Sequence, residues 1–122
     1  FKQINDTYGH NVGDQVLLAF SQSLSENTRT QDLLARWGGE EFVLACPDTT
    51  LENACGLAEK LRRCIEENDW PKALQVTASF GVAQMHAHES PTDFIARADQ
   101  ALYEAKAQGR NCSVMASDHM DG

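Results

Sequence analysis

The sequence predicts an α/β fold, an α+β sandwich in which helices flank a mixed central β-sheet. Two observations support this prediction. In three segments apolar residues recur every three or four positions, which is typical of helices with one buried face. Between these segments, apolar residues form short runs or alternate with polar ones, which is typical of strands. With one further helix at the start of the chain, the resulting order is helix, helix, hairpin, helix, strand, helix, strand, which places helices against a sheet.

The first half of the chain contains a predicted helix and a predicted hairpin. Residues 14–26 carry one apolar stripe. The stripe consists of Leu17, Phe20 and Leu24. Two apolar runs follow at residues 33–37 and 42–46, separated by Gly-Gly-Glu-Glu at 38–41. Two glycines between apolar runs predict a tight hairpin, because the favoured hairpin turns need positive φ angles.

The second half contains two predicted helices and two predicted strands. A capping box formed by Thr49 and Glu52 begins a helix with one apolar face. That face consists of Leu51, Ala54, Ala58, Leu61 and Ile65. Residues 74–83 alternate between apolar and polar side chains and predict a strand. The last helix begins at Ser90-Pro91 and ends at Gly109, and a short strand at residues 111–115 follows it.

Length and charge limit the classes of function. A chain of 122 residues suits a single domain, here predicted at 1–115 with a polar tail at 116–122. The net charge of −8 argues against a nucleic-acid polymer or an anionic membrane as partner. It leaves open a small phosphate site built from two or three local cations. Four cysteines without metal-ligand spacing indicate reduced thiols and a cytoplasmic location, with any membrane anchor elsewhere in the full-length protein.

The hairpin turn carries two adjacent carboxylates, Glu40 and Glu41, after Gly38 and Gly39. Hard cations such as Mg²⁺ bind carboxylate and phosphate oxygens together, so this turn is a candidate metal site. The alternative is a solvated hairpin, which is the ordinary role of such a turn.

Polar residues suited to a nucleotide lie at both ends of the chain. Asn5, His10 and Asp14 fall within one short stretch, and a carboxylate with an amide can recognise the edge of guanine. Alternatively, Asn5 and Asp14 cap helices. Lys106 and Arg110 lie at the end of the last helix, where cations also complement the helix dipole.

Four segments along the chain carry a recognisable pattern: residues 1–14 (FKQINDTYGHNVGD), 36–42 (RWGGEEF), 79–82 (SFGV) and 98–111 (ADQALYEAKAQGRN). In this order they resemble the GGDEF domain of diguanylate cyclases. The first carboxylate of the signature is glutamate rather than aspartate. The resemblance implies the fold shared by nucleotidyl cyclases and palm-type polymerase domains. It also implies a reaction that condenses two GTP molecules into cyclic di-GMP and two pyrophosphates, with Mg²⁺ or Mn²⁺, between two domains that meet face to face.

The resemblance also assigns roles to individual residues. Glu40 is implied as metal ligand and base, and Glu41 as a second metal carboxylate. The implied substrate-binding residues are Phe1, Lys2, Asn5, His10, Asp14, Gly38, Gly39, Lys106 and Arg110. Within that set, Asn5 and Asp14 recognise guanine and the two cations of the last helix hold the β- and γ-phosphates. Alternatively, His10 only shapes a turn with Gly9. Asp99 is interpreted as a buried structural carboxylate and not as a ligand.

A second site is implied at Arg29 and Asp32. Their Arg-x-x-Asp spacing, close before the glycine turn, resembles the site through which many such cyclases bind cyclic di-GMP and are inhibited. Arginine presents a planar fork to phosphate or guanine, and aspartate accepts from guanine N–H groups. The alternative is a loop ion pair. Many members add a further arginine from the following helix, where this sequence has Lys60 with Arg62 and Arg63 nearby, so the second half of the site stays open.

The chief departure from the family lies at the start, because the family's metal-binding aspartate precedes the Phe-Lys pair. We therefore expect the 122-residue piece alone to lack cyclase activity, and expect an upstream sensory or dimerising segment in the full-length protein. A different class of function is a non-catalytic receptor for cyclic di-GMP that keeps the fold. A plain structural domain would leave the joint presence of the candidate site residues unexplained.

Overall fold

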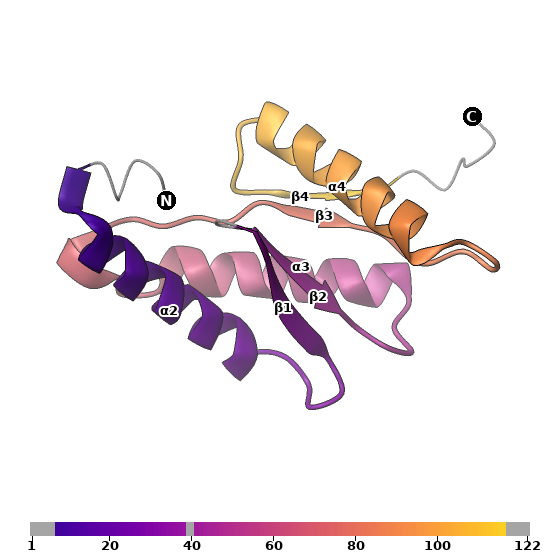
Figure 1. Ribbon diagram of the computed structural model, residues 1–122, viewed down its shortest axis with the longest axis horizontal. Coiled ribbons are helices and arrows are strands. Elements are labelled where there is room, and N and C mark those ends of the chain that lie inside the picture. Colours follow the sequence, from indigo (N-terminus) through magenta and orange to yellow (C-terminus); the bar gives the residue numbers. More distant parts are fainter. Residues whose placement is uncertain (1–6, 39–40, 117–122) are drawn as a thin grey trace. The chain divides into compact units, whose positions relative to one another are not determined.

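The computed structural model describes residues 7–38 and 41–116 (Figure 1). Its elements are α2 (His10–Glu26), β1 (Leu33–Gly38), β2 (Glu41–Ala45), α3 (Leu51–Glu67), the short 3₁₀ helix η1 (Pro71–Ala73), β3 (Phe80–Val82), α4 (Pro91–Ala107) and β4 (Ser113–Met115). Helices and strands alternate, which confirms the predicted α/β class. The chain forms two compact units, one made of Phe1–Asp48 and Glu67–Val76, the other of Thr49–Glu66 and Thr77–Gly122.

In the first unit, α2 begins four residues earlier than the apolar stripe predicts. Gly9, with φ of 88°, separates the helical residues Thr7 and Tyr8 from α2, and this left-handed conformation suits glycine. His10 is therefore the first residue of α2, and Asp14 lies inside the helix. The alternative that Asp14 is a helix cap is thereby wrong.

The core of the first unit is built on one face of α2. The buried apolar residues of this face are Val12, Val16, Phe20 and Leu24. The Phe20 ring lies 5.3 Å from the ring of Phe42 on β2 and 6.4 Å from that of Trp70, measured between centroids. Two predicted core positions, Phe20 and Leu24, are confirmed, whereas Leu17 is only half-buried.

The predicted hairpin is confirmed as the antiparallel pair β1–β2. Arg36 lies opposite Phe42 and Gly38 lies opposite Glu41, with a shift of register between Arg36 and Gly38. Such a bulge inserts an extra residue in one strand and turns the end of the strand. The hairpin therefore approaches its turn with a local twist that the regular part of the ladder does not have.

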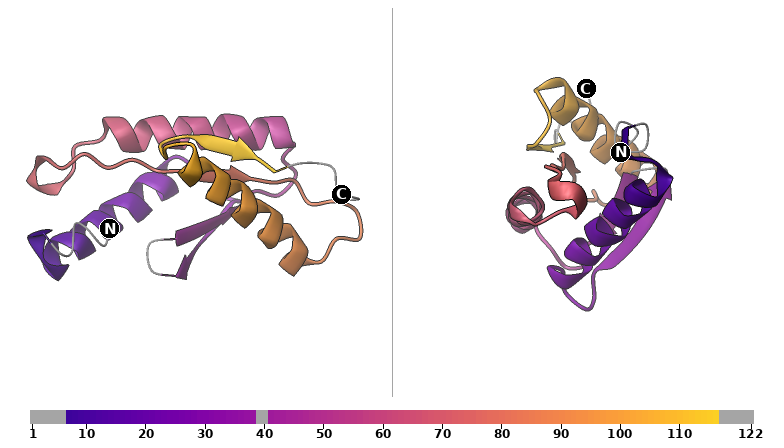
Figure 2. Two further views of the ribbon diagram at one scale, coloured as in Figure 1. Left: turned by 90° about the horizontal axis from the view of Figure 1, so that it is seen from above. Right: turned by 90° about the vertical axis from the view of Figure 1, so that its left-hand side faces the viewer.

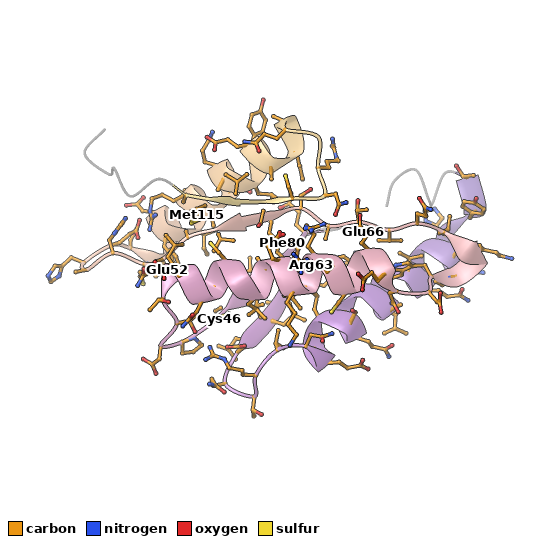
Figure 3. All side chains as sticks on the ribbon, turned by 180° about the vertical axis from the view of Figure 1, so that it is seen from behind. Cys46, Glu52, Arg63, Glu66, Phe80 and Met115 are labelled. Carbon is orange, nitrogen blue, oxygen red and sulfur yellow. The ribbon has the colours of Figure 1, made fainter. Side chains whose placement is uncertain are left out.

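The second unit places β3 and β4 between two helices. Figures 1 and 2 show α3 and α4 on opposite sides of this parallel strand pair, and Figure 3 shows Phe80 of β3 beside α3. The buried residues of this unit come from all three layers. They are Ala58, Leu61 and Ile65 of α3, Ala78, Val82 of β3, and Ala101 and Ala105 of α4. The predicted apolar face of α3 is thus confirmed at its three most buried positions.

Of the two predicted helix starts in this unit, one is wrong by one residue and one is confirmed. The hydroxyl of Thr50 accepts a hydrogen bond from the Asn53 N–H at 3.2 Å, so the cap of α3 lies one residue after the predicted Thr49. The Ser90 hydroxyl accepts from the Asp93 N–H at 3.1 Å, which confirms the predicted start of α4. Asp99 of α4 is exposed, so its interpretation as a buried carboxylate was wrong.

The strand predicted at residues 74–83 is much shorter in the structure. Val76 and Ala78 are buried while Gln75 and Thr77 are exposed, so the side chains alternate as the pattern predicts. Only Phe80–Val82 pairs with another strand, however. Within the described residues, the strands form two separate two-stranded sheets, one antiparallel and one parallel, rather than one central sheet. Side-chain alternation reports burial, and it does not report whether a ladder partner is present.

Gly81 allows β3 to lie directly against α4. A Cβ atom at this position would overlap the backbone of Ala98 and Leu102. Glycine is thus required here for close approach of two backbones.

A largely covered ion pair fixes the loop between β3 and α4. Arg97 of α4 donates from Nε to Glu89 Oε2 at 2.7 Å, and the two side chains are 12% and 4% exposed. Glu89 also accepts from the His86 N–H at 3.0 Å, and Arg97 donates to the Gln84 carbonyl. The hydrogen bonds from Arg97 lower the pKa of Glu89 from 4.5 to about 2, with a further contribution from the His86 backbone.

This pair predicts acid sensitivity of the second unit. Because the pKa of Glu89 is lowered on folding, its contribution to stability is complete above 4.5 and is lost as the pH falls toward 2. We expect Glu89→Gln to lower the free energy of unfolding at neutral pH, and the difference from the unsubstituted protein to shrink over that range. Urea denaturation at several pH values measures this difference. A difference that stays constant down to pH 2 would contradict the prediction.

No helix in the described part of the chain is both long enough and apolar enough to cross a bilayer.

Candidate functional site

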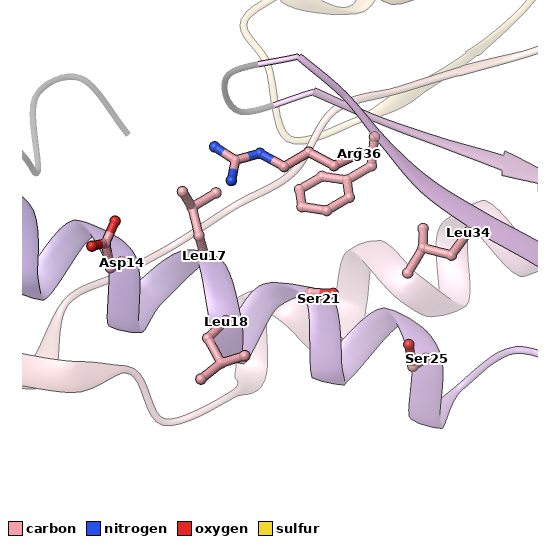
Figure 4. Close-up of a pocket in the computed structure, with 8 residues that line it drawn as sticks. Asp14, Leu17, Leu18, Ser21, Ser25, Leu34 and Arg36 are labelled. Carbon is pink, nitrogen blue, oxygen red and sulfur yellow. The ribbon is translucent and has the colours of Figure 1, made fainter.

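A pocket of about 480 Å³ lies in the first unit between α2 and the β1–β2 hairpin (Figure 4). Eight residues line it: Asp14, Leu17, Leu18, Ser21 and Ser25 of α2, Leu34 and Arg36 of β1, and Phe42 of β2. The helical residues among them recur at three- and four-residue steps, so they form one stripe of α2. Leu34 and Arg36 are two residues apart on β1 and share one face of the strand.

The lining combines apolar walls with charged groups of both signs. Leu17, Leu34 and Phe42 supply apolar surface, and Asp14 and Arg36 supply a carboxylate and a guanidinium. Small-molecule sites commonly combine apolar surface with polar groups that fix orientation, and they are about 300–1,000 Å³ in volume. In the part of the chain that the structure describes, the Asp14 carboxylate has no hydrogen-bond or ion-pair partner. It is therefore available to a ligand.

Sequence reasoning found Asp14 but missed the rest of this pocket. Leu17 is predicted for the core, and Leu34, Arg36 and Phe42 are assigned only to strands. The missed signal is the register of the hairpin, because Arg36 and Phe42 lie directly opposite each other and Leu34 shares their face. On this face the hairpin presents the exposed Arg36 beside the half-buried Leu34 and Phe42, so a charged group lies next to apolar surface.

Other predicted substrate-binding residues of the first unit lie near the ends of these elements. His10 is the exposed first residue of α2, one helical turn before Asp14. Gly38 and the exposed Glu41 face each other as the last paired residues of the hairpin. The remaining predicted residues, namely Phe1, Lys2, Asn5, Gly39 and Glu40, lie outside the described residues.

The two predicted phosphate-binding cations belong to the second unit. Lys106 is half-buried in the last turn of α4, and Arg110 is exposed two residues after the helix cap. Arg110 donates its backbone N–H to the Ala105 carbonyl at 3.0 Å, and Gly109 donates to the Lys106 carbonyl at 3.3 Å. This pair of bonds is a Schellman motif, which Gly109 ends with φ of 113°. The chain therefore reverses tightly between the two cations.

Arg29 and Asp32 form a closed ion pair in the first unit. Arg29 NH2 lies 2.9 Å from Asp32 Oδ1, and the Arg29 backbone N–H donates to Oδ2 at 2.9 Å. The guanidinium also donates to the Pro47 carbonyl at 3.2 Å. The side chain of Asp32 is fully covered, while that of Arg29 is 46% exposed. Hydrogen bonding to Arg29 lowers the pKa of Asp32 and raises that of Arg29.

This geometry is that of the loop ion pair considered as the alternative. The carboxylate of Asp32 already accepts hydrogen bonds from the backbone N–H and the guanidinium of Arg29. Binding of a guanine edge by Asp32 therefore requires the pair to open. A product-binding role for the pair stays a proposal.

The metal site predicted at the hairpin turn rests on Glu40 and Glu41. Glu41 presents an exposed carboxylate as the first residue of β2, and carboxylate oxygens are suitable ligands for Mg²⁺. Within residues 7–38 and 41–116, no cluster of three or more His, Cys, Asp or Glu residues is arranged to hold an ion. The donor chemistry fits a hard cation that is also coordinated by substrate phosphates.

Comparison with known proteins identifies the family. The sequence profile described as "Diguanylate cyclase, GGDEF domain" matches residues 1–112. The chain belongs to the GGDEF domain family. The Gly-Gly-Glu-Glu-Phe stretch that begins at Gly38 is the signature of this family with glutamate at its first acidic position.

Three relatives illustrate the similarity of this GGDEF domain. It is 43% identical over 120 residues to response regulator PleD of Caulobacter vibrioides, covering 93% of this chain and 26% of PleD. It is 46% identical over 111 residues to diguanylate cyclase DgcM of Escherichia coli, covering 91% of this chain and 27% of DgcM. The active GGEEF domain of a diguanylate cyclase from Vibrio cholerae superposes with a TM-score of 0.89 at 33% identity, covering 96% of this chain and 76% of that one. The chain thus spans about a quarter of the length of PleD and DgcM.

Proposed function

We propose that this chain is the catalytic domain of a diguanylate cyclase. In the proposed reaction, the 3′-hydroxyl of each of two GTP molecules attacks the α-phosphate of the other. Two phosphodiester bonds form, two pyrophosphates leave, and cyclic di-GMP is the product. The observation that carries this proposal is the pocket beside Asp14 in a chain of the GGDEF family.

The pocket suits the base of GTP. A purine ring gains from apolar surface on its faces, which Leu17, Leu34 and Phe42 offer. A carboxylate only accepts hydrogen bonds, so Asp14 pairs with the N–H donors of guanine and not with the corresponding edge of adenine, where a ring nitrogen accepts. Asn5 adds donors and acceptors in the proposed site. We therefore expect GTP to be preferred strongly over ATP, since a site built to hydrogen-bond one edge rejects the other.

The triphosphate is assigned to the end of α4 and to the hairpin turn. Lys106 and Arg110 bind the β- and γ-phosphates, aided by backbone N–H groups near Phe1 and Lys2. Glu40 and Glu41 hold Mg²⁺ or Mn²⁺, which supplies charge neutralisation at the phosphates and a lower pKa of the attacking hydroxyl. Glu40 accepts the proton of that hydroxyl, and His10, Gly38 and Gly39 line the site.

Each domain binds one GTP, so the reaction needs two copies of this chain in a homodimer. Dimerisation and the input signal are assigned to a sensory segment of the full-length protein. Cyclic di-GMP inhibits the enzyme by binding at Arg29 and Asp32. The proposed partners are thus GTP, cyclic di-GMP and a second copy, without a nucleic-acid polymer or a membrane surface for this domain, in the cytoplasm.

The proposal is tested with the full-length protein, GTP and Mg²⁺. We expect cyclic di-GMP and pyrophosphate in a 1:2 ratio, no product when a chelator removes the metal, and no product from ATP. Absence of cyclic di-GMP under these conditions would overturn the proposed cyclase activity. If the same protein still binds cyclic di-GMP, a receptor is the better description. The isolated 122-residue piece is expected to be inactive in the same assay.

Removal of the Arg29 guanidinium is expected to weaken binding of cyclic di-GMP. We expect Arg29→Ala to raise its Kd about tenfold or more, because a charged hydrogen-bond donor to phosphate or guanine is lost. Arg29→Lys keeps the charge without the planar fork and should recover only part of the affinity. Isothermal titration with cyclic di-GMP measures these constants. Unchanged tight binding by Arg29→Ala would assign product to another surface.

A further inference from the structure

The turn after α4 has an unusual backbone that begins at its C-cap. Three consecutive residues adopt positive φ angles, 113° at Gly109, 64° at Arg110 and 48° at Asn111. Glycine takes this conformation without strain and asparagine tolerates it, but arginine does not favour it. The Schellman bonds of this turn satisfy the last carbonyls of α4 and account for Gly109 alone. The conformation of Arg110 must therefore be held from outside the helix.

Asn111 provides that restraint through three hydrogen bonds. Its backbone N–H donates to Ser79 Oγ at 3.1 Å, and its side-chain oxygen accepts from Arg62 NH1 at 3.1 Å. Its side-chain amide donates to Glu66 Oε2. Both ends of the Asn111 amide are thus occupied by α3, the helix on the other side of the β3–β4 pair, whose face with Glu66 and Arg63 is visible in Figure 3.

Arg62 is itself tightly fixed. Its Nε donates to Glu59 Oε2 at 3.0 Å and NH2 donates to Glu59 Oε1 at 3.2 Å, so the pair is bidentate. The Arg62 side chain is only 16% exposed. Glu59 also accepts from the Ser113 hydroxyl of β4 at 3.0 Å. An arginine held in one geometry by a fork of hydrogen bonds is a rigid donor for Asn111.

We propose that Asn111, hydrogen-bonded to Arg62 and Glu66, is the positioning residue that holds Arg110 for binding the triphosphate. This inference rests on the proposed function and extends it to α3, which contacts no part of the nucleotide in that proposal. Arg110 sits between the Schellman turn and Asn111, so its backbone is fixed on both sides. Loss of these hydrogen bonds to Asn111 lets Arg110 return to an ordinary negative φ and moves its guanidinium away from the phosphates.

The test measures GTP kinetics and ligand binding in the full-length protein. Arg62→Met removes the donor to Asn111 and keeps an apolar stem, and Asn111→Ala removes the amide alone. Each is expected to raise the KM for GTP about tenfold, the effect of one hydrogen bond to a charged group, with kcat little changed. Competitive binding of guanosine, which has no phosphates, should stay as in the unsubstituted protein. The double variant should raise the KM no further than Asn111→Ala does, because that single change already removes the Arg62–Asn111 hydrogen bond that both variants share.

Arg63→Met is the matched control, since it removes the same charge from the adjacent, exposed position of α3. It should leave the KM for GTP unchanged. Unchanged KM in both Arg62→Met and Asn111→Ala would overturn the inference while the cyclase assignment stands. Equal losses of guanosine and GTP binding would also overturn it, because they indicate a general disturbance of the fold. If the unsubstituted protein makes no cyclic di-GMP, the proposed function fails and this inference falls with it.

Discussion

Glu40→Gln is expected to reduce the formation of cyclic di-GMP about a thousandfold, the rate equivalent of several kcal/mol of lost metal and proton-transfer chemistry. Glutamine has the shape of glutamate but neither its negative charge nor its ability to accept a proton. Phosphoryl transfer depends on charge neutralisation and positioning, so a neutral amide at a metal ligand removes the main catalytic contribution. The measurement is the initial rate of cyclic di-GMP formation by the full-length protein with saturating GTP and Mg²⁺.

The control for this substitution is Glu52→Gln, which makes the same chemical change at an exposed position in the first turn of α3. Its rate should equal that of the unsubstituted protein. Glu40→Gln should still bind guanosine, because the base is assigned to Asp14 and the pocket on α2. Equal rates for Glu40→Gln and the unsubstituted protein would remove Glu40 from the mechanism and leave the guanine site in place.

Gly81→Ala is expected to destabilise the second unit by about 3 kcal/mol or more, at the upper end of overpacking effects. The added methyl group would overlap the backbone of Ala98 and Leu102, and backbone atoms cannot swing aside as a side chain can. The strand or α4 must therefore move, which disturbs the packing of Ala101 and Ala105. Urea denaturation measures the loss, and hydrogen exchange locates it to α4.

The chain offers a matched glycine for this test. Gly56 lies inside α3 with nothing near the position of an added Cβ. Gly56→Ala is expected to stabilise the protein by up to about 1 kcal/mol, since alanine is the better helix former. A similar loss of stability in both variants would show that the second unit is intolerant of alanine in general, and that close approach at Gly81 is not the cause.

Most helices were predictable because their signals are local. The Ser90 cap, the proline after it and the glycine stop of α4 act within a few residues of the helix ends, so the sequence alone reveals them. The start of α2 was missed because residues 10–13 carry no apolar stripe and its cap, Gly9, acts through its backbone. The length of β3 was missed because a strand ends where its ladder partner ends, and that partner, β4, lies about thirty residues away in the chain.

The residues of the candidate site likewise divide into those that the sequence reveals and those that depend on tertiary structure. Asp14 stood out because a carboxylate in a glycine-rich polar stretch is visible without a structure. The contributions of Leu17 and Arg36 depend on how α2 lies against the hairpin, which no local pattern encodes. Whether Asp32 is free to bind a ligand depends on its hydrogen bonds with Arg29, so the sequence could only leave the ion pair and the product site as alternatives.

The register shift between Arg36 and Gly38 makes the number of residues in the hairpin a stricter constraint than their identity. Successive residues of a strand point to opposite faces, so one residue added or removed there would exchange the faces of everything beyond it. The pair Gly38–Glu41 beyond the shift would be lost, whereas replacement of a side chain leaves the ladder in place. Substitutions in this segment are therefore expected to change the activity of the protein gradually. An insertion or deletion at the register shift is expected to abolish that activity in one step.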